Sequence, residues 1–136
     1  MSRLLAVAYQ TADSEEFVTA IAAATQADPA NEVFLLVPAT PVTHLAVWTE
    51  GESRAVAAEK AKKARARLEQ DGVEVSEVRI GDPDPFQAVM NVLATESFDS
   101  MIVSTFAPGL SRWLKGDLIS RLQQAAGIPV THITAR

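Results

Sequence analysis

A run of hydroxyl, glycine and guanidinium groups between residues 104 and 112 contains the types of side chain that bind anions. Ser104, Thr105 and Ser111 supply hydroxyls, Gly109 supplies a flexible turn, and Arg112 supplies one guanidinium. Such donors suit the oxygens of a phosphate or a carboxylate. The alternative is a capped surface loop with Arg112 in solvent, and the sequence slightly favours that alternative.

Other residues offer weaker chemistry. His44 and His132 show no metal-ligand spacing, and His44 is most simply a loop residue that faces solvent. Asp82 and Thr105 are similar to the acceptor site of response-regulator receivers, but the acidic pair and the lysine of that site are missing. No G-x-S-x-G nucleophile elbow occurs. The sequence therefore predicts no catalytic residue and no metal site.

The composition is that of a small acidic globular domain. The chain has 136 residues, of which 48% are apolar and 21% charged, and its net charge is −5. This length predicts a single domain over residues 1–136. The absence of cysteine excludes disulfides, thiolate-bound metals and thiol catalysis. The acidic balance argues against nucleic acids and anionic membranes as partners, because both attract basic surfaces.

The apolar segments are too short to suggest a membrane protein. None approaches the roughly 18 residues that span a bilayer. The first residues also lack the apolar core and the cleavage site of a secretory signal. We therefore expect a cytoplasmic protein.

Five segments have the composition of strands. Residues 4–8, 33–37 and 101–103 are apolar without alternation, which is typical of strands buried on both faces of a parallel sheet. Residues 73–80 and 129–134 mix apolar and polar side chains, which predicts two edge strands.

Helix signals separate these strands. Asp13 with Glu16, and Asp84 with Gln87, have the spacing of N-terminal capping boxes, and Asp117 is placed to cap the last helix. A long helix is predicted over residues 53–70. The predicted buried stripes are Phe17, Ile21 and Ala24; Ala57, Ala61, Ala64 and Leu68; Phe86, Val89, Met90 and Leu93; and Leu118, Leu122 and Ala125.

Strands that alternate with helices predict an α/β fold with a parallel sheet covered on both faces. Ligands of such folds bind beyond the carboxyl ends of the strands, where the chain reverses its winding direction. This rule selects the loops after the first and fourth strands. The candidate ligand-binding residues are therefore Ala8, Tyr9, Gln10, Ser104, Thr105, Gly109, Ser111, Arg112, Gly116 and Asp117.

Three segments, in their order and spacing, carry a resemblance. They are Gly81-Asp82-Pro83 before a helix, residues 104–116 before a capped helix, and Gly127-Ile128-Pro129-Val130 before the last strand. Together they resemble the universal stress protein family over nearly the whole chain. The resemblance implies a Rossmann-like three-layer sandwich with a five-stranded parallel sheet in the order 3-2-1-4-5. It also implies a homodimer paired through the last strand, at Val130, Thr131, His132, Ile133 and Thr134.

Some members of that family bind ATP, and the sequence departs from both features that those members share. Ala8 stands where they have an aspartate that reads adenine. Their glycine-rich phosphate loop is not restored by any alignment on Gly116, and Asp117 replaces its last hydroxyl. A carboxylate about 4 Å from a phosphate charge would cost on the order of 4 kcal/mol at an effective dielectric constant near 20. That exceeds the roughly 2 kcal/mol that a helix N-terminus offers an anion.

The sequence thus predicts a universal-stress-protein-like domain that acts as a non-catalytic binding or regulatory homodimer. It predicts no required cofactor, and tight ATP binding is disfavoured. An unidentified protein partner is expected. The first alternative is a protein that binds a nucleotide or another phosphate ligand through residues 104–117, and the second is an unrecognised small hydrolase.

Overall fold

The structure is a computed structural model that describes residues 3–8, 11–12, 14–28, 31–39, 50–106 and 118–135. In these ranges strands and helices alternate along the chain. The strands are β1 (Arg3–Val7), β2 (Glu32–Pro38), β3 (Val75–Gly81), β4 (Ser100–Phe106) and β5 (Val130–Ala135). The helices are α1 (Glu15–Ala27), α2 (Glu50–Gln70), α3 (Pro85–Leu93) and α4 (Leu118–Ala125).

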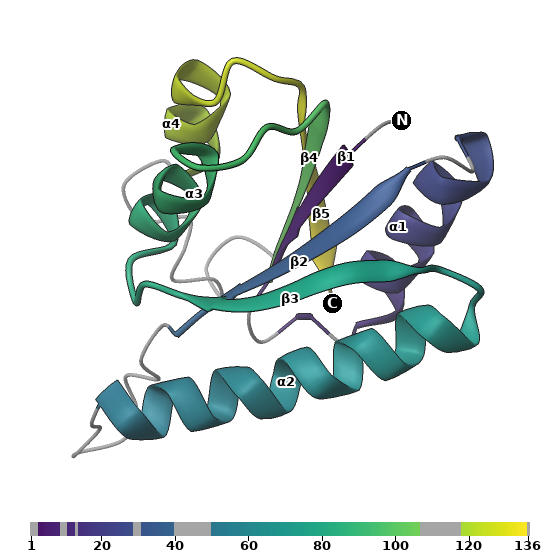
Figure 1. Ribbon diagram of the computed structural model, residues 1–136, viewed down its shortest axis with the longest axis horizontal. Coiled ribbons are helices and arrows are strands. Elements are labelled where there is room, and N and C mark those ends of the chain that lie inside the picture. The colour runs from purple at the N-terminus through teal and green to yellow at the C-terminus, as the bar shows by residue number, and fades with distance from the viewer. Residues whose placement is uncertain are drawn as a thin grey trace.

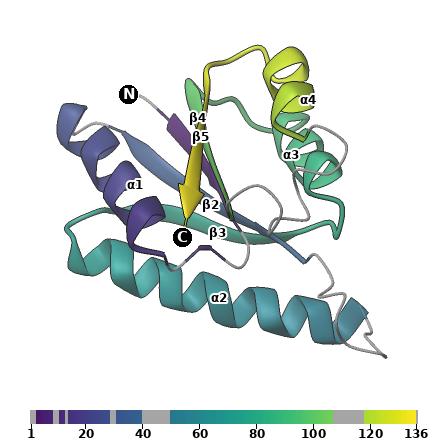
Figure 2. The same cartoon turned by 180° about the vertical axis from the view of Figure 1, so that it is seen from behind.

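The five strands form one parallel sheet in the order β3-β2-β1-β4-β5. Helices α1 and α2 cover one face of the sheet, and α3 and α4 cover the other (Figure 1). The view from behind shows the same three layers, with the long α2 running beneath β2 and β3 (Figure 2). The predicted fold class and strand order are confirmed.

The central strands are buried because they carry apolar side chains on both faces. In β1 and β2 every residue from Leu4 to Val7 and from Val33 to Val37 is at most 1% exposed. The edge strands β3 and β5 are only partly buried, which matches their mixed composition. The core therefore lies on β1, β2 and β4, as the apolar runs predicted.

The helix α2 packs through the predicted stripe of small residues. Ala57, Ala61, Ala64 and Leu68 are all buried. Their spacing places them on one side of the helix, and three of the four side chains are single methyl groups. The helix can therefore lie close to β2 and β3.

Two predictions about helix caps have different outcomes. Helix α1 begins one position later than predicted: Ser14 is its N-cap, and its hydroxyl accepts the N–H of Phe17 at 3.2 Å. Asp84 caps α3 as predicted, with its carboxylate accepting the N–H of Phe86 at 2.9 Å. Gln87 does not complete a capping box, since its side chain donates to Asn91 at 2.7 Å.

The buried stripes of α3 and α4 also differ in part from the prediction. In α3 the buried residues are Ala88, Val89 and Val92, and the larger Phe86, Met90 and Leu93 pack at the margin of the core. In α4, Leu118 and Leu122 are buried and Ala125 is exposed, because this short helix ends at Ala125.

The last residue of β3, Gly81, lies where neighbouring atoms leave no room for a side chain. A Cβ atom added to Gly81 would lie 2.8 Å from the Cβ of Ala88 and 2.9 Å from Cδ1 of Leu36. Glycine at this position therefore allows α3 to approach the sheet. Among the residues described, no helix is both long and apolar enough to cross a bilayer.

Candidate functional site

The structure describes three of the ten predicted ligand-binding residues: Ala8, Ser104 and Thr105. The other seven lie outside the described ranges: Tyr9, Gln10, Gly109, Ser111, Arg112, Gly116 and Asp117. His44 also lies outside them. The site can therefore be built from the ends of the strands, where β1 and β4 lie side by side.

Ala8 continues the path of β1 into the sheet. Its N–H donates to the carbonyl of Leu36 at 3.2 Å, and its side chain is fully buried. A methyl group can neither accept nor donate a hydrogen bond. The position that directly follows β1 therefore places a buried apolar group next to the point where the chain reverses its winding direction.

Ser104 and Thr105 lie in β4 and not, as predicted, in a loop after residue 103. A buried pair of hydroxyls joins this strand to the turn before α1. Oγ of Ser104, at the end of β4, donates to Oγ1 of Thr11 at 2.7 Å. The two residues are only 1% and 3% exposed. Because each hydroxyl has a partner, the pair avoids the cost of an unsatisfied buried polar group. It holds the carboxyl-terminal part of β4 against the turn that precedes α1.

Thr11 was not among the ten candidate residues, although it lies in the connection after the first strand that the topology rule selects. Its only signal in the sequence is a hydroxyl in the short connection after β1, on the side of the sheet where β4 also ends. Its backbone is held as well, since its carbonyl accepts the N–H of Ser14 at 3.0 Å. The contact with Ser104 spans 93 positions of sequence, so only the fold brings the two together.

The next residue of β4 makes a second short contact on the opposite face of the sheet. Oγ1 of Thr105 lies 2.6 Å from Nε2 of His132 on β5, and Thr105 is 2% exposed. Side chains of consecutive strand residues point to opposite faces, so Ser104 and Thr105 reach different neighbours. Burial lowers the pKa of His132 below its usual 6.5, which favours the neutral ring.

These contacts engage the polar side chains that the structure describes at the ends of β1 and β4. Ser104 is bonded to Thr11, and Thr105 to His132. Asp82 accepts the N–H of Asp84 at 2.9 Å, which is the role of a turn residue. Within the described residues no group of three histidine, aspartate or glutamate side chains could hold a metal ion.

The strand β5 forms one edge of the sheet, as its mixed composition predicted. The dimer contact implied by the resemblance would lie along this edge. Thr131 and Thr134 are exposed, whereas Val130, His132 and Ile133 are partly buried. The N–H of Met101 donates to the carbonyl of Pro129, and Met101 pairs with Val130. Since hydrogen bonds recur at every second residue of a parallel ladder, the N–H groups of Thr131 and Ile133 face β4. Those of His132 and Thr134 face outward.

A different cluster lies on the sheet away from the crevice. Arg3 donates to Glu96 at 3.0 Å, and its guanidinium carbon lies 4.8 Å from the centre of the Phe98 ring. Arg79 lies 3.4 Å from the same carboxylate and 5.0 Å above Phe34. The two rings meet edge to face at 5.4 Å. We call these five residues the amino-end cluster, since Arg3 is the first residue of β1.

Sequence comparisons find no relative: no protein-family model matches the chain, and no curated protein matches it. Comparison with solved structures finds universal stress proteins. The structure of such a protein from Archaeoglobus fulgidus matches with a TM-score of 0.68 and 11% identity, covering 98% of this chain and 94% of that one. A universal stress protein in complex with cAMP matches with a TM-score of 0.65 and 18% identity over 98% of both chains.

A universal stress protein family protein from Arabidopsis thaliana, with AMP bound, matches with a TM-score of 0.63 and 12% identity. The match covers 100% of this chain and 93% of that one. At these identities the likeness concerns the fold. The chain has the universal stress protein fold, with the strand order that the resemblance implied.

Proposed function

We propose that this protein is a regulatory member of the universal stress protein family that binds partners rather than catalysing a reaction, and that it does not bind ATP tightly. One observation carries the proposal: where β1 and β4 end side by side, the buried side chains are the methyl group of Ala8 and the bonded hydroxyls of Thr11 and Ser104. The strands of the fold are in place at this end of the sheet, and the hydroxyls of Ser104 and Thr11 are bonded to each other.

The physical cost of placing a nucleotide there supports the proposal. Ala8 offers no acceptor to the amino group of an adenine. A phosphate oxygen that accepted the hydroxyl proton of Ser104 would have to displace its contact with Thr11, which would leave a buried hydroxyl without a partner at a cost of about 1–3 kcal/mol. Asp117, at the predicted end of the phosphate loop, adds a like charge against phosphate.

Thr105 and His132 support a binding role over a hydrolytic one. Their 2.6 Å contact has the length expected of a nucleophile and its base. However, Thr105 is buried, and no carboxylate in the described part of the chain is bonded to His132 to orient the ring. A catalytic triad needs both access to the nucleophile and that third group.

A second candidate function is the binding of a nucleoside monophosphate. The observation that favours it is that two proteins of the same fold were solved with AMP or cAMP. A monophosphate carries less charge toward Asp117 than a triphosphate does. This candidate predicts that AMP or cAMP binds more tightly than ATP.

Calorimetric titration with ATP, AMP and cAMP, together with native mass spectrometry of the purified protein, tests both functions. The leading proposal expects no retained nucleotide and an ATP dissociation constant of about 1 mM or weaker. That limit corresponds to a binding free energy of about −4 kcal/mol. Saturable binding of AMP or cAMP with weak ATP binding would establish the second candidate. ATP retained at full occupancy would overturn the leading proposal.

A gain-of-function variant sharpens the test. The double substitution Ala8→Asp with Asp117→Ser supplies the acid and the hydroxyl that the ATP-binding members share, while the two earlier glycines of their loop stay absent. We expect ATP affinity to rise in this variant and not in Ala8→Ser with Asp117→Asn, which removes the charge without supplying the acid. Equal affinities in the two double variants would contradict our account of the crevice.

The proposed homodimer is paired through the outer edge of β5. Thr134→Pro removes an outward N–H without breaking the ladder to β4, whereas Thr134→Val keeps that N–H. We expect the proline variant to sediment as a monomer and the valine variant as a dimer. A proline variant that keeps the dimeric mass while circular dichroism shows it folded would exclude this edge as the interface.

A further inference from the structure

The strand β3 ends the sheet on the side opposite β5. Within the described part of the chain only β2 pairs with it. The N–H of Ala39 donates to the carbonyl of Gly81 at 3.1 Å, so the backbone of Gly81 faces β2. Because the bonds of a parallel ladder recur at every second residue, the backbone groups of Val78 and Ile80 point outward. An added strand would bond to these groups.

Two side chains of opposite charge flank the outward residue Val78. Glu77 and Arg79 lie on the same face of the sheet, and Nη2 of Arg79 lies 2.6 Å from Oε2 of Glu77. The same Nη2 lies 3.4 Å from Glu96, and the guanidinium carbon lies 5.0 Å from the centre of the Phe34 ring. These contacts hold Arg79 in place but use only one of its three nitrogens.

Both charged side chains keep the capacity for a further partner. In the described part of the chain, Nη1 and Nε of Arg79 and Oε1 of Glu77 make no hydrogen bond or ion pair. The two side chains are 40% and 43% accessible. A carboxylate can therefore pair with Arg79, and a cation with Glu77, while the existing contacts remain.

The order of these charges selects the strand that fits. When the central residue of an antiparallel strand lies opposite Val78, the residue before it lies opposite Arg79 and the residue after it lies opposite Glu77. Opposite residues of such a pair have Cα atoms about 4.5–5.5 Å apart, so side chains of opposite charge can meet. The fitting strand therefore carries a carboxylate, an apolar residue and a cation, in that order.

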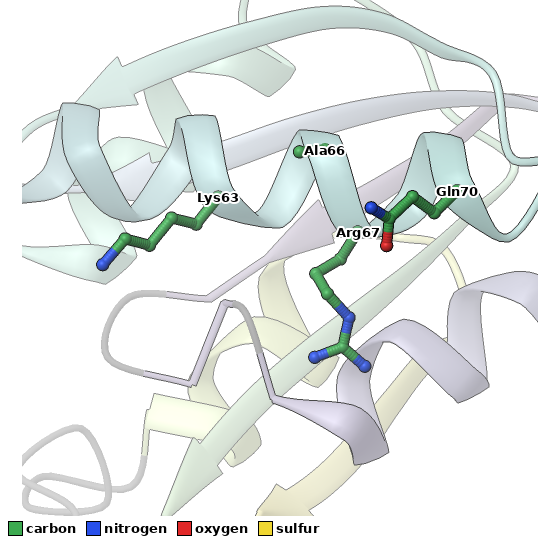
Figure 3. Close-up of a pocket in the computed structure, with 4 residues that line it drawn as sticks. All are labelled: Lys63, Ala66, Arg67 and Gln70. Carbon is green, nitrogen blue, oxygen red and sulfur yellow. The ribbon is translucent and has the colours of Figure 1, made fainter.

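A whole second copy of this chain has the same order at residues 77–79, but its α2 would stand in the way. Lys63 and Arg67, which line a hollow, extend from the side of α2 that faces α1 (Figure 3). The rotation of about 100° per residue puts the exposed Lys62 and Arg65 on the other flank, toward the free edge of β3. Two copies joined at β3 would bring these cations of both helices together. A segment with no helix beneath it fits better.

We propose that the outer edge of β3 binds an extended segment of a partner protein, which adds to the sheet as an antiparallel strand. The segment carries its carboxylate opposite Arg79, its apolar residue opposite Val78 and its cation opposite Glu77. This names the kind of partner for the proposed binding role, on which it rests. The edge lies apart from the crevice between β1 and β4, so retained ATP would overturn the proposed function without removing this surface.

Fluorescence anisotropy with three labelled peptides tests the proposal. The matched probe is Thr-Val-Glu-Val-Arg-Val-Thr, which has seven residues like β3, and the two controls carry Glu-Val-Glu or Arg-Val-Arg at its centre. We expect the full-length protein to bind the matched peptide about tenfold more tightly than either control, because each control places like charges opposite one another. Equal or absent binding of the three peptides would overturn the proposal. So would the doubly basic peptide binding most tightly, since net charge alone would favour it on a chain of −5.

A charge-reversing variant connects the binding to β3. Glu77→Arg places cations at both flanking positions, so this variant should bind the Glu-Val-Glu peptide most tightly. Glu59→Arg makes the same change of charge at an exposed site on α2 and should keep the order of the unmodified protein. Circular dichroism shows whether both variants fold. An unchanged order of the three peptides in folded Glu77→Arg would overturn the proposal.

Amide hydrogen exchange locates the bound strand without any substitution. The N–H groups of Val78 and Ile80 point away from β2, so saturating matched peptide should slow their exchange about tenfold or more. The N–H of Arg79 faces β2 and should change much less. If the peptide binds and the exchange of Val78 and Ile80 stays the same, the site lies elsewhere and the proposal is wrong.

Discussion

The carboxyl end of the sheet and the amino-end cluster both hold polar side chains against the core, but those side chains are neutral at the first and charged in the second. At the carboxyl end of β1 and β4, the described polar contacts join three buried hydroxyls and one partly buried imidazole in pairs. In the amino-end cluster, two guanidinium groups share the carboxylate of Glu96 and stack on two aromatic rings. The carboxyl end is held by contacts between neutral side chains, and the amino-end cluster is held by contacts of charged side chains.

The difference shows where charge is tolerated in this molecule. The cations of the amino-end cluster are partly exposed: the side chains of Arg3 and Arg79 are 31% and 40% accessible. Water therefore still solvates them, and their pairing adds orientation more than net energy. The residues at the crevice are almost fully covered, where an unpaired charge would be costly. Among the described residues, the polar contacts at the carboxyl end of β1 and β4 are thus made by neutral groups.

The largest effect is expected from Phe34, which anchors the amino-end cluster. It is fully buried and contacts both Phe98 and Arg79. Phe34→Ala should lower the free energy of unfolding by about 3–5 kcal/mol, since it leaves a cavity and removes both ring contacts. The matched control Phe34→Leu keeps most of the apolar volume and should cost clearly less. Urea denaturation measures both, and equal losses would mean that the ring contacts contribute nothing.

The hydroxyl pair should have the next largest effect. Ser104→Ala leaves Thr11 buried without its partner and should cost about 1–3 kcal/mol, whereas Ser104→Ala with Thr11→Val removes both hydroxyls and should recover part of that loss. A double-mutant cycle in urea gives the coupling energy directly. Strictly additive single effects would contradict a direct bond between the two side chains.

The shared carboxylate of the amino-end cluster should contribute less. Glu96→Gln weakens the contacts with Arg3 and Arg79 and should cost about 0.5–1 kcal/mol, decreasing as salt is raised. Glu69→Gln is the matched control, because its pair with Arg65 is about half exposed on both sides and should contribute close to nothing. Thermal denaturation at low and high salt compares the two. A larger loss in the Glu69 variant would reverse the assignment.

The smallest effect is a pH dependence at the carboxyl end. Burial lowers the pKa of His132 in the folded state, so the unfolded chain binds a proton more readily. The stability that this residue supports should be complete above pH 6.5 and should decrease as the pH falls through the lowered folded-state pKa. His132→Phe should remove this component of the acid sensitivity. Urea midpoints measured from pH 7.5 to pH 5 test it, and parallel curves for the two proteins would exclude His132 as the titrating group.

Much of the fold could be read from local patterns. The uninterrupted apolar runs of the central strands predicted burial on both faces, and the alanine spacing of α2 predicted its buried side. The N-cap at Asp84 could also be predicted from the sequence, because a cap is a contact between residues that are close along the chain. Where two cap residues stood side by side, the local pattern favoured Asp13 and the structure uses Ser14.

The candidate site depended far more on tertiary structure. Sequence reasoning reached Ser104 and Thr105 through the topology rule, but their partners, Thr11 and His132, lie 93 and 27 positions away. The amino-end cluster joins Arg3 to Glu96 across a similar separation. Local sequence determined which segments are strands and helices, because hydrophobic periodicity and caps act over a few residues. Only the folded sheet decided which hydroxyls, rings and charges meet, because strand order brings together residues that share no pattern along the chain.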